Sequence, residues 1–167
     1  MPAPDDPVGS EPTTYNLLFV CSGNTCRSPL AESIAARAVS ERGWSHVAVA
    51  SAGTGAAPGA PAAENAVLVG AEHGLDLSAH RARALTPETV DWADLVLVIS
   101  PAHLATVADL GGSEKVALLT DFIEGPGLGV PIDDPFGGDP DAYRVAYDQI
   151  AAAIEGLLAK LEPILAP

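Results

Sequence analysis

Two residues of contrasting chemistry, a thiol and a guanidinium, stand close together near the start of the chain. Cys21 is followed by the small and polar residues Ser-Gly-Asn-Thr-Cys and then by Arg27. Backbone N–H groups of such a loop, together with the start of a following helix, can surround an anion, and a guanidinium can bind two of its oxygens. A thiol in that field ionises readily and becomes a nucleophile. The spacing therefore predicts covalent chemistry on a phosphoryl group, with Cys21 as nucleophile and Arg27 as phosphate ligand.

The spacing of Cys21 and Arg27 is weak evidence alone, because a buried structural cysteine beside a tight turn would look similar. Its context strengthens the catalytic interpretation. The apolar run 17–20 predicts a buried strand before the loop, and Ser28-Pro29 predicts a helix start, with Ser28 as the cap and Pro29 in the first turn. A purely structural cysteine would not explain why an arginine shares its loop.

Transfer of a phosphoryl group also requires an acid that protonates the departing group. The long segment 121–138, rich in glycine and proline, carries Asp133 and Asp134, and loops of this length in compact domains are often functional. Either carboxylate could serve as the acid. We favour Asp134, because the following Pro135 restricts its backbone and can hold the carboxylate in place.

Composition and charge exclude several classes of protein. The 167 residues are 48% hydrophobic and 18% charged, which predicts a globular chain, with one domain over 14–167 and a flexible tail over 1–13. A net charge of -14 with only eight basic residues argues against a nucleic-acid partner. No apolar stretch is long enough for a membrane span, and residues 1–13 do not resemble a secretory signal. With only two cysteines, both in one loop, we expect a cytoplasmic location.

The pattern of apolar residues predicts strands that alternate with helices. Strands are expected at 15–20, 47–51, 95–99 and 116–119, and helices at 29–42, 62–73, 86–91, 101–110 and from 139 onward. This order predicts an α/β fold of three layers, a four-stranded parallel sheet with helices on both faces, and ligands at the carboxyl ends of the strands. The last helix has one apolar face, expected in the core: Tyr143, Tyr147, Ile150, Ile154, Leu157, Leu158 and Leu161.

Three motifs in order, at 21–29, 51–53 and 134–138, resemble the low-molecular-weight protein-tyrosine-phosphatase family. The resemblance runs from about Tyr15 to Leu161. It implies a flavodoxin-like sheet and a phosphatase of the phosphoric monoester hydrolase type, which needs no metal or cofactor and acts on phosphorylated proteins. In this reaction Cys21 would form a phosphocysteine, Arg27 would clamp the phosphate, and Asp134 would act first as acid and then as base.

The same resemblance implies roles for further residues. Ser28 would donate a hydrogen bond to the Cys21 thiolate, and Asn24, Ser28, Ser51 and His80 would form a polar network that holds the loop. The substrate and its phosphate would contact Ser22, Gly23, Asn24, Thr25, Cys26, Arg27, Ser28 and Phe136. The remaining histidines, His46, His73 and His103, have no spacing suited to a metal, and no role is predicted for them.

Thr25 favours phosphoarginine as the substrate. The loop Cys-Ser-Gly-Asn-Thr-Cys-Arg resembles that of the family's bacterial protein-arginine phosphatases, whereas tyrosine-specific relatives generally carry a bulkier aliphatic residue in place of Thr25. A threonine hydroxyl can accept a hydrogen bond from a guanidinium N–H, and an aliphatic side chain cannot. The loop 53–59 also has no aromatic residue to stack on a phenol ring. Phosphotyrosine remains the alternative, because Phe136 could form one wall of a phenol pocket.

Two other classes share parts of this pattern. Thioredoxin-coupled arsenate reductases resemble the same loop and fold, but they need two further cysteines, and this chain has only Cys21 and Cys26. A phosphate-binding module without catalysis would need neither the Cys21 thiol nor an acid at Asp134. The two cysteines could also form a reversible disulfide that protects Cys21 from further oxidation.

Overall fold

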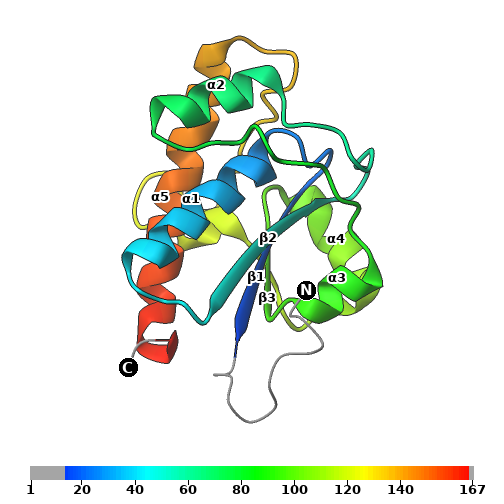
Figure 1. Ribbon diagram of the computed structural model, residues 1–167. Helices are drawn as coiled ribbons and strands as arrows, with labels where there is room; N and C mark the ends of the chain where they lie inside the picture. Colours follow the sequence, from blue (N-terminus) through cyan, green and yellow to red (C-terminus); the bar gives the residue numbers. More distant parts are fainter. Residues whose placement is uncertain (1–13, 166–167) are drawn as a thin grey trace.

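A parallel sheet of four strands forms the centre of the computed structural model, which describes residues 14–165 (Figure 1). The strands lie in the order β2-β1-β3-β4. Their bounds are β1 (Tyr15–Cys21), β2 (Val47–Gly53), β3 (Leu95–Val98) and β4 (Val116–Leu118). All neighbouring strands run parallel, which confirms the predicted sheet. The predicted tail over 1–13 lies outside the described residues.

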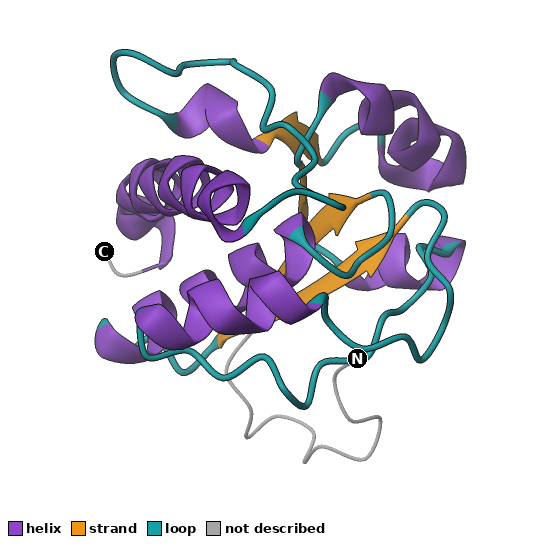
Figure 2. Cartoon of the chain, turned by 90° about the horizontal axis from the view of Figure 1, so that it is seen from above, coloured by secondary structure: helices purple, strands orange, loops and turns teal. Residues whose placement is uncertain are grey.

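Helices cover both faces of this sheet, and the view from above shows the three layers (Figure 2). One face packs against α1 (Arg27–Glu41), α2 (Glu64–Glu72) and α5 (Pro140–Leu165). The other carries α3 (Pro87–Trp92) and α4 (Leu104–Val107). Successive residues of β1 alternate between the two layers, as the pleat of a strand requires: Leu17 and Phe19 face the first, Leu18 and Val20 the second. The predicted α/β architecture is thereby confirmed.

Three short helical turns lie between β3 and α5: η1 (Pro101–His103), the π-helical turn η2 (Ala108–Gly112) and η3 (Leu119–Phe122). The single helix predicted over 101–110 is therefore split into η1, α4 and η2. Helix α1 also differs from its predicted start. It begins at Arg27 with Cys26 at the cap position, so the prediction of Ser28 as the cap is wrong. Ser28 lies inside the first turn, where its hydroxyl contacts the Cys21 sulfur instead.

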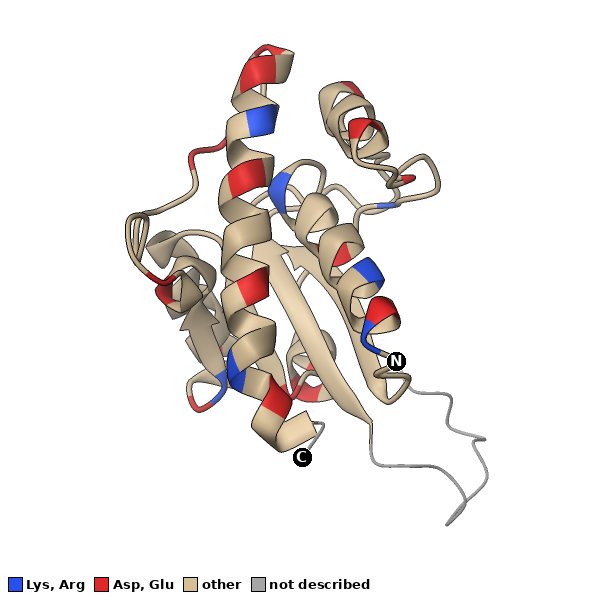
Figure 3. Ribbon diagram, turned by 90° about the vertical axis from the view of Figure 1, so that its left-hand side faces the viewer, with Lys and Arg blue, Asp and Glu red and all other residues tan. Residues whose placement is uncertain are grey.

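Helix α5 separates apolar and acidic residues onto opposite faces. Each of the seven residues predicted for its core face is buried. Its exposed acidic residues recur at every seventh position: Asp141, Asp148, Glu155 and Glu162. Figure 3 shows the acidic positions of this helix as red segments of its ribbon. This acidic face thus carries four of the chain's 22 acidic residues. Among residues 14–165, no helix combines the length and apolar composition that crossing a bilayer requires.

Candidate active site

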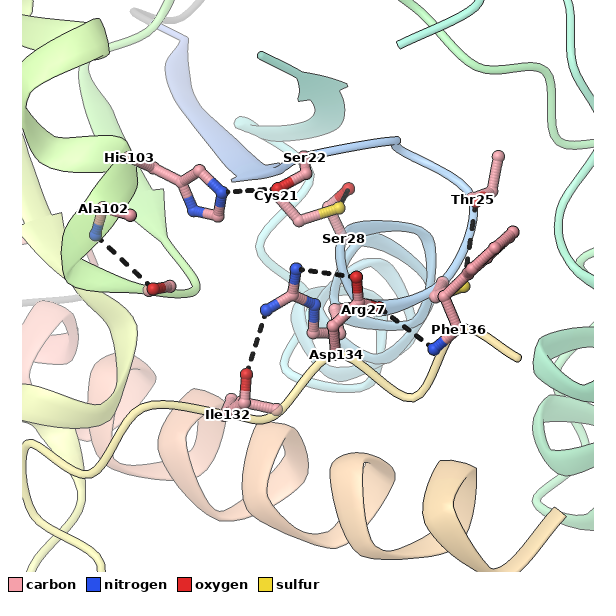
Figure 4. Close-up of polar contacts among 12 residues, drawn as sticks. Cys21, Ser22, Thr25, Arg27, Ser28, Ala102, His103, Ile132, Asp134 and Phe136 are labelled. Atoms are coloured by element: carbon pink, nitrogen blue, oxygen red, sulfur yellow. Dashed lines mark hydrogen bonds and ion pairs between the residues drawn. The ribbon is translucent and has the colours of Figure 1, made fainter. Parts of the chain in front are cut away.

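The loop between β1 and α1 holds the thiol at the carboxyl end of the central strand. Cys21 is the last residue of β1, and its side chain is 2% exposed. The Cys21 Sγ lies 2.9 Å from the Ser28 Oγ (Figure 4). Asn24 donates from Nδ2 to the Ser28 Oγ at 2.8 Å, so the serine's own proton is free to point at the sulfur. A hydroxyl donor aimed at the sulfur stabilises a thiolate.

Asn24 connects this loop to two other parts of the chain. It is fully buried and has a φ of 55°, a left-handed conformation that asparagine tolerates better than most residues. Its Nδ2 also donates to the Ser51 Oγ at 2.9 Å, and its Oδ1 accepts from the Arg83 backbone N–H at 2.8 Å. The His80 Nε2 lies 2.7 Å from the Asn24 carbonyl oxygen. The structure thus brings together Asn24, Ser28, Ser51 and His80.

Glu32, for which no role was predicted, extends this network. Its Oε1 accepts a hydrogen bond from the Ser51 hydroxyl. Because Ser51 donates to Glu32, its oxygen is left to accept from Asn24, and the directions of the hydrogen bonds in the network become fixed. The pairing of Glu32 on α1 with Ser51 on β2 depends on how the helix packs against the sheet. No local sequence signal would have revealed it.

The end of β2 and the residues after it also contact the loop between β1 and α1, through backbone hydrogen bonds. The Gly55 backbone N–H donates to the Ser22 carbonyl oxygen at 2.8 Å, and the Thr54 N–H donates to the Cys21 carbonyl oxygen at 3.0 Å. A Cβ atom at Gly53 would lie 2.5 Å from the Ser22 carbonyl oxygen and 2.9 Å from the Asn24 nitrogen. Both neighbours are backbone atoms that cannot easily move, so this close approach requires glycine.

Arg27 places a nearly buried guanidinium beside the thiol. The residue is 5% exposed, and its Nη1 donates to the Ile132 carbonyl oxygen at 2.9 Å. Its Nη2 lies 3.8 Å from the Asp134 Oδ2, and its Nε–H is buried without a partner among the described residues. A buried, unpaired N–H is costly, and an anion bound at the loop would supply its acceptor.

A cavity of about 370 Å³ opens above the thiol. Asp134 lies at this cavity and Asp133 does not line it, although the sequence left both open. The Phe136 backbone N–H donates to the Asp134 Oδ1 at 3.0 Å, which fixes the carboxylate, while the Phe136 side chain is 73% exposed at the rim. The cavity is lined by Cys21, Ser22, Gly23, Thr25, Cys26, Arg27, Thr54, Gly55, Asp134 and Phe136.

Cys26, the second thiol of the loop, contacts helix α5. Its Sγ lies 3.4 Å from the Tyr143 hydroxyl, and both residues are buried. Burial raises the pKa of the Cys26 thiol, and the hydrogen bond with Tyr143 offsets part of this increase. Burial likewise raises the pKa of Tyr143. The pair is therefore neutral near pH 7, so Cys26 adds no negative charge beside Cys21.

His103, for which the sequence predicts no role, lies against the loop. It belongs to η1, directly after β3, and is 6% exposed. Its Nε2 lies 2.9 Å from the Ser22 Oγ. Burial lowers the pKa of His103, and the nearby positive charge of Arg27 lowers it further. Within residues 14–165, no group of three or more histidine, cysteine or acidic residues is arranged to hold a metal ion.

The fold and this site define a class of α/β protein whose parallel sheet carries, at its carboxyl end, a loop with a buried thiol and a buried guanidinium. Comparison with known proteins identifies the family within this class. The model of the family "low molecular weight phosphotyrosine protein phosphatase" matches residues 16–164. The chain therefore belongs to this family and is a protein phosphatase. This confirms the resemblance, the fold and the enzyme class expected from the sequence.

Several named relatives are similar over most of their length. A protein-arginine-phosphatase of Geobacillus stearothermophilus is 37% identical over 89% of this chain and 97% of its own. A low molecular weight protein-tyrosine-phosphatase of Streptomyces coelicolor is 37% identical over 87% of this chain and 93% of its own. Among solved structures, a mutant of the YwlE arginine phosphatase with a phosphorylated active-site serine has a TM-score of 0.79 at 34% identity, covering 88% of this chain and 95% of that one.

Proposed function

We propose that this enzyme removes phosphoryl groups from protein side chains through a phosphocysteine at Cys21. The Cys21 thiolate attacks phosphorus, the bond to the leaving group breaks, and Asp134 donates a proton to the departing atom. Water then attacks the phosphocysteine, Asp134 accepts a proton from it, and phosphate and the free thiolate are released. Arg27 and the loop N–H groups bind the phosphoryl oxygens throughout, where negative charge accumulates.

One observation carries this proposal: the buried guanidinium of Arg27 has an Nε–H without a partner among residues 14–165, and it lies beside a buried thiol that contacts a hydroxyl. A cationic ligand would be repelled by this guanidinium, and a neutral ligand would leave its buried charge without a counter-charge. The solved structure of a phosphorylated active-site serine in a related arginine phosphatase supports the covalent intermediate. An arsenate reductase would require thiols beyond Cys21 and Cys26, which are the chain's only cysteines.

Phosphoarginine is the substrate that the cavity walls favour. Thr25 and Thr54 both line the cavity, so two hydroxyls are available to accept hydrogen bonds from a guanidinium. The Thr25 hydroxyl makes a long contact of 3.7 Å with the Cys26 sulfur, which leaves its oxygen able to accept from a ligand. The similarity to a protein-arginine-phosphatase at 37% identity supports this choice.

Phosphotyrosine is the second candidate, and Phe136 is the observation in its favour. An exposed aromatic ring at the rim of the cavity could pack against a phenol. The tyrosine phosphatase of Streptomyces coelicolor matches this chain with the same percentage identity as the arginine phosphatase. Phosphorylated proteins are the proposed partners in either case. A cytoplasmic location is also proposed, since the site depends on two free thiols.

A direct comparison of kcat/KM on phosphoarginine and phosphotyrosine peptides tests the substrate. The same ratio is then measured for Thr25→Ile, and Thr25→Ser serves as the matched control because it keeps the hydroxyl. We expect Thr25→Ile to shift the ratio toward phosphotyrosine by about tenfold or more, since it leaves a substrate N–H unpaired. An unchanged ratio would contradict the specificity assignment.

Turnover of an aryl phosphate without added metal tests the reaction itself. The wild-type enzyme is expected to be active and Cys21→Ser inactive. Equal, near-zero rates for both proteins would instead support a phosphate-binding module.

A further inference from the structure

His103 is a buried histidine that the proposed reaction does not use. Hydrogen bonding places the end of β3 beside the end of β1, because the Ile99 N–H donates to the Val20 carbonyl oxygen at 3.0 Å. The chain then turns into η1, whose last residue is His103. Figure 4 shows the imidazole reaching Ser22 from one side of the thiol, with Thr25 and Phe136 on the other.

The surroundings of the imidazole indicate which nitrogen carries the proton. The Nε2 has a partner in the Ser22 Oγ at 2.9 Å, whereas the Nδ1 is buried without a partner among residues 14–165. A buried N–H without an acceptor is rarer and more costly than an acceptor without a donor. The favoured tautomer of a neutral His103 therefore carries its proton on Nε2 and donates it to Ser22.

Because the His103 Nε2–H donates to the Ser22 hydroxyl, the hydrogen-bonding role of that hydroxyl is determined. A hydroxyl that accepts from an imidazole N–H keeps its own proton for another acceptor. Ser22 is exposed, lines the cavity and directly follows the Cys21 nucleophile. Its carbonyl oxygen accepts from Gly55, so its backbone is held independently of the histidine.

We propose that His103 is a positioning residue: it donates from Nε2 to the Ser22 Oγ, so that the Ser22 hydroxyl donates its proton to an oxygen of the anion bound over Cys21. Ser22 thereby adds a neutral donor to the ring of loop N–H groups and Arg27. The inference depends on the proposed function only in that the cavity binds a phosphoryl group. Burial and the charge of Arg27, which both lower the pKa of His103, keep the imidazole neutral and in this role near pH 7.

Inorganic sulfate is a suitable probe, because it presents the same tetrahedral oxygens without a leaving group. Its inhibition constant against aryl-phosphate turnover is measured for the wild type, Ser22→Ala, His103→Phe and the double variant. Each single variant is expected to raise that constant about tenfold, which is the effect of one hydrogen bond to a charged group. The double variant is expected to match Ser22→Ala, because His103 acts only through that hydroxyl.

A conservative substitution of His103 distinguishes a role in orienting the Ser22 hydroxyl from a role in packing alone. His103→Gln places an amide N–H near the position of Nε2 and is expected to keep sulfate inhibition within about threefold of the wild type. His46→Gln, at the opposite end of β2 where its ring contacts the Leu165 carbonyl oxygen, is the matched control. Thermal unfolding of each variant identifies a folding defect. Should His103→Phe fail to fold, Ser22→Ala and His103→Gln still decide the question.

Three results would overturn the inference. One is an unchanged sulfate constant in Ser22→Ala, and another is additive effects in the double variant. The third is a nitrogen–proton correlation spectrum of the imidazole showing the proton on Nδ1. If the wild type neither binds sulfate nor hydrolyses aryl phosphate, the proposed function fails. If the wild type does both and Ser22→Ala has the same sulfate inhibition constant as the wild type, only this inference fails.

Discussion

The two loops that meet at the cavity are built in opposite ways. The loop from Cys21 to Arg27 is mostly buried, and Asn24, Ser51, His80 and the end of β2 hold it through hydrogen bonds. The segment from Asp133 to Gly138 is largely exposed. Its link to the first loop is the Arg27 side chain, through the preceding Ile132 carbonyl oxygen and Asp134. The proposed phosphate-binding loop is therefore held rigidly by hydrogen bonds, whereas the proposed acid, Asp134, lies on a segment with few contacts to that loop.

Loss of the nucleophile is expected to have the largest effect. Cys21→Ser keeps the size of the side chain but removes the thiolate, so turnover should fall on the order of 10⁴-fold or more. Trapping with a slow substrate, followed by mass spectrometry, should show a phosphoryl adduct on Cys21 in the wild type. An adduct on any other residue would contradict the division between the two loops.

Mild peroxide should inactivate the enzyme completely but reversibly, by oxidising the two cysteines of the buried loop. Peroxide oxidises the Cys21 thiolate to a sulfenic acid and is reduced to water, and the Cys26 thiol then condenses with it, releasing a second water and forming a disulfide. Mass spectrometry should show the loss of two hydrogens, and a thiol reductant should restore activity. Sulfinic acid on Cys21 without an internal disulfide would rule this protection out.

Loss of the acid should cost less than loss of the nucleophile. Asp134→Asn is expected to lower kcat on the order of 10²–10³-fold for poor leaving groups, and much less for good ones that need no proton. Asp133→Asn is the matched control, because this neighbour is exposed and does not line the cavity. Equal losses in both variants would show that the acid is not fixed at Asp134.

A pair of glycine substitutions compares the two loops directly. Gly53→Ala forces a Cβ against the Ser22 and Asn24 backbone, and it should reduce the unfolding free energy by about 1–3 kcal/mol and the activity about 100-fold. Gly137→Ala meets no atom within 4 Å, and only its φ of 79° opposes the change, at about 1–2 kcal/mol. Its activity should change only a few-fold. Denaturant unfolding and steady-state kinetics measure both effects, and a reversed order of activity would refute the contrast between the loops.

The smallest effect is expected at the rim. Phe136→Ala removes a ring that is 73% exposed, so the melting temperature should stay the same and KM should rise less than tenfold. Leu128→Ala, in the same long loop but not lining the cavity, is the control. A large loss of kcat in Phe136→Ala would mean that the ring helps to position Asp134.

The sequence was sufficient for the features that depend on local pattern. Apolar runs separated by helical periods predicted the parallel sheet, and the arrangement of strand, loop and helix placed Cys21 and Arg27 at its edge. Contacts between distant segments were not predictable in this way. Neither Glu32 beside Ser51 nor His103 beside Ser22 leaves a periodic signal, because each depends on how a helix or turn packs against the sheet. The cap prediction for Ser28 is wrong because the helix begins at Arg27, before the Ser-Pro pair; the contact of Ser28 with the Cys21 sulfur is the one that the family resemblance implies.

The backbone carbonyl and the side-chain hydroxyl of Thr25 have different surroundings. Its carbonyl oxygen is held by the Ala63 N–H at 2.9 Å, yet its hydroxyl has only a long contact to sulfur. The main chain of Thr25 thus helps to hold the loop, while its hydroxyl is available for the substrate contact that we propose. Under the proposed function, one exchange of this side chain would therefore redirect the enzyme toward another phosphorylated residue, while the backbone contacts that hold the loop stay in place.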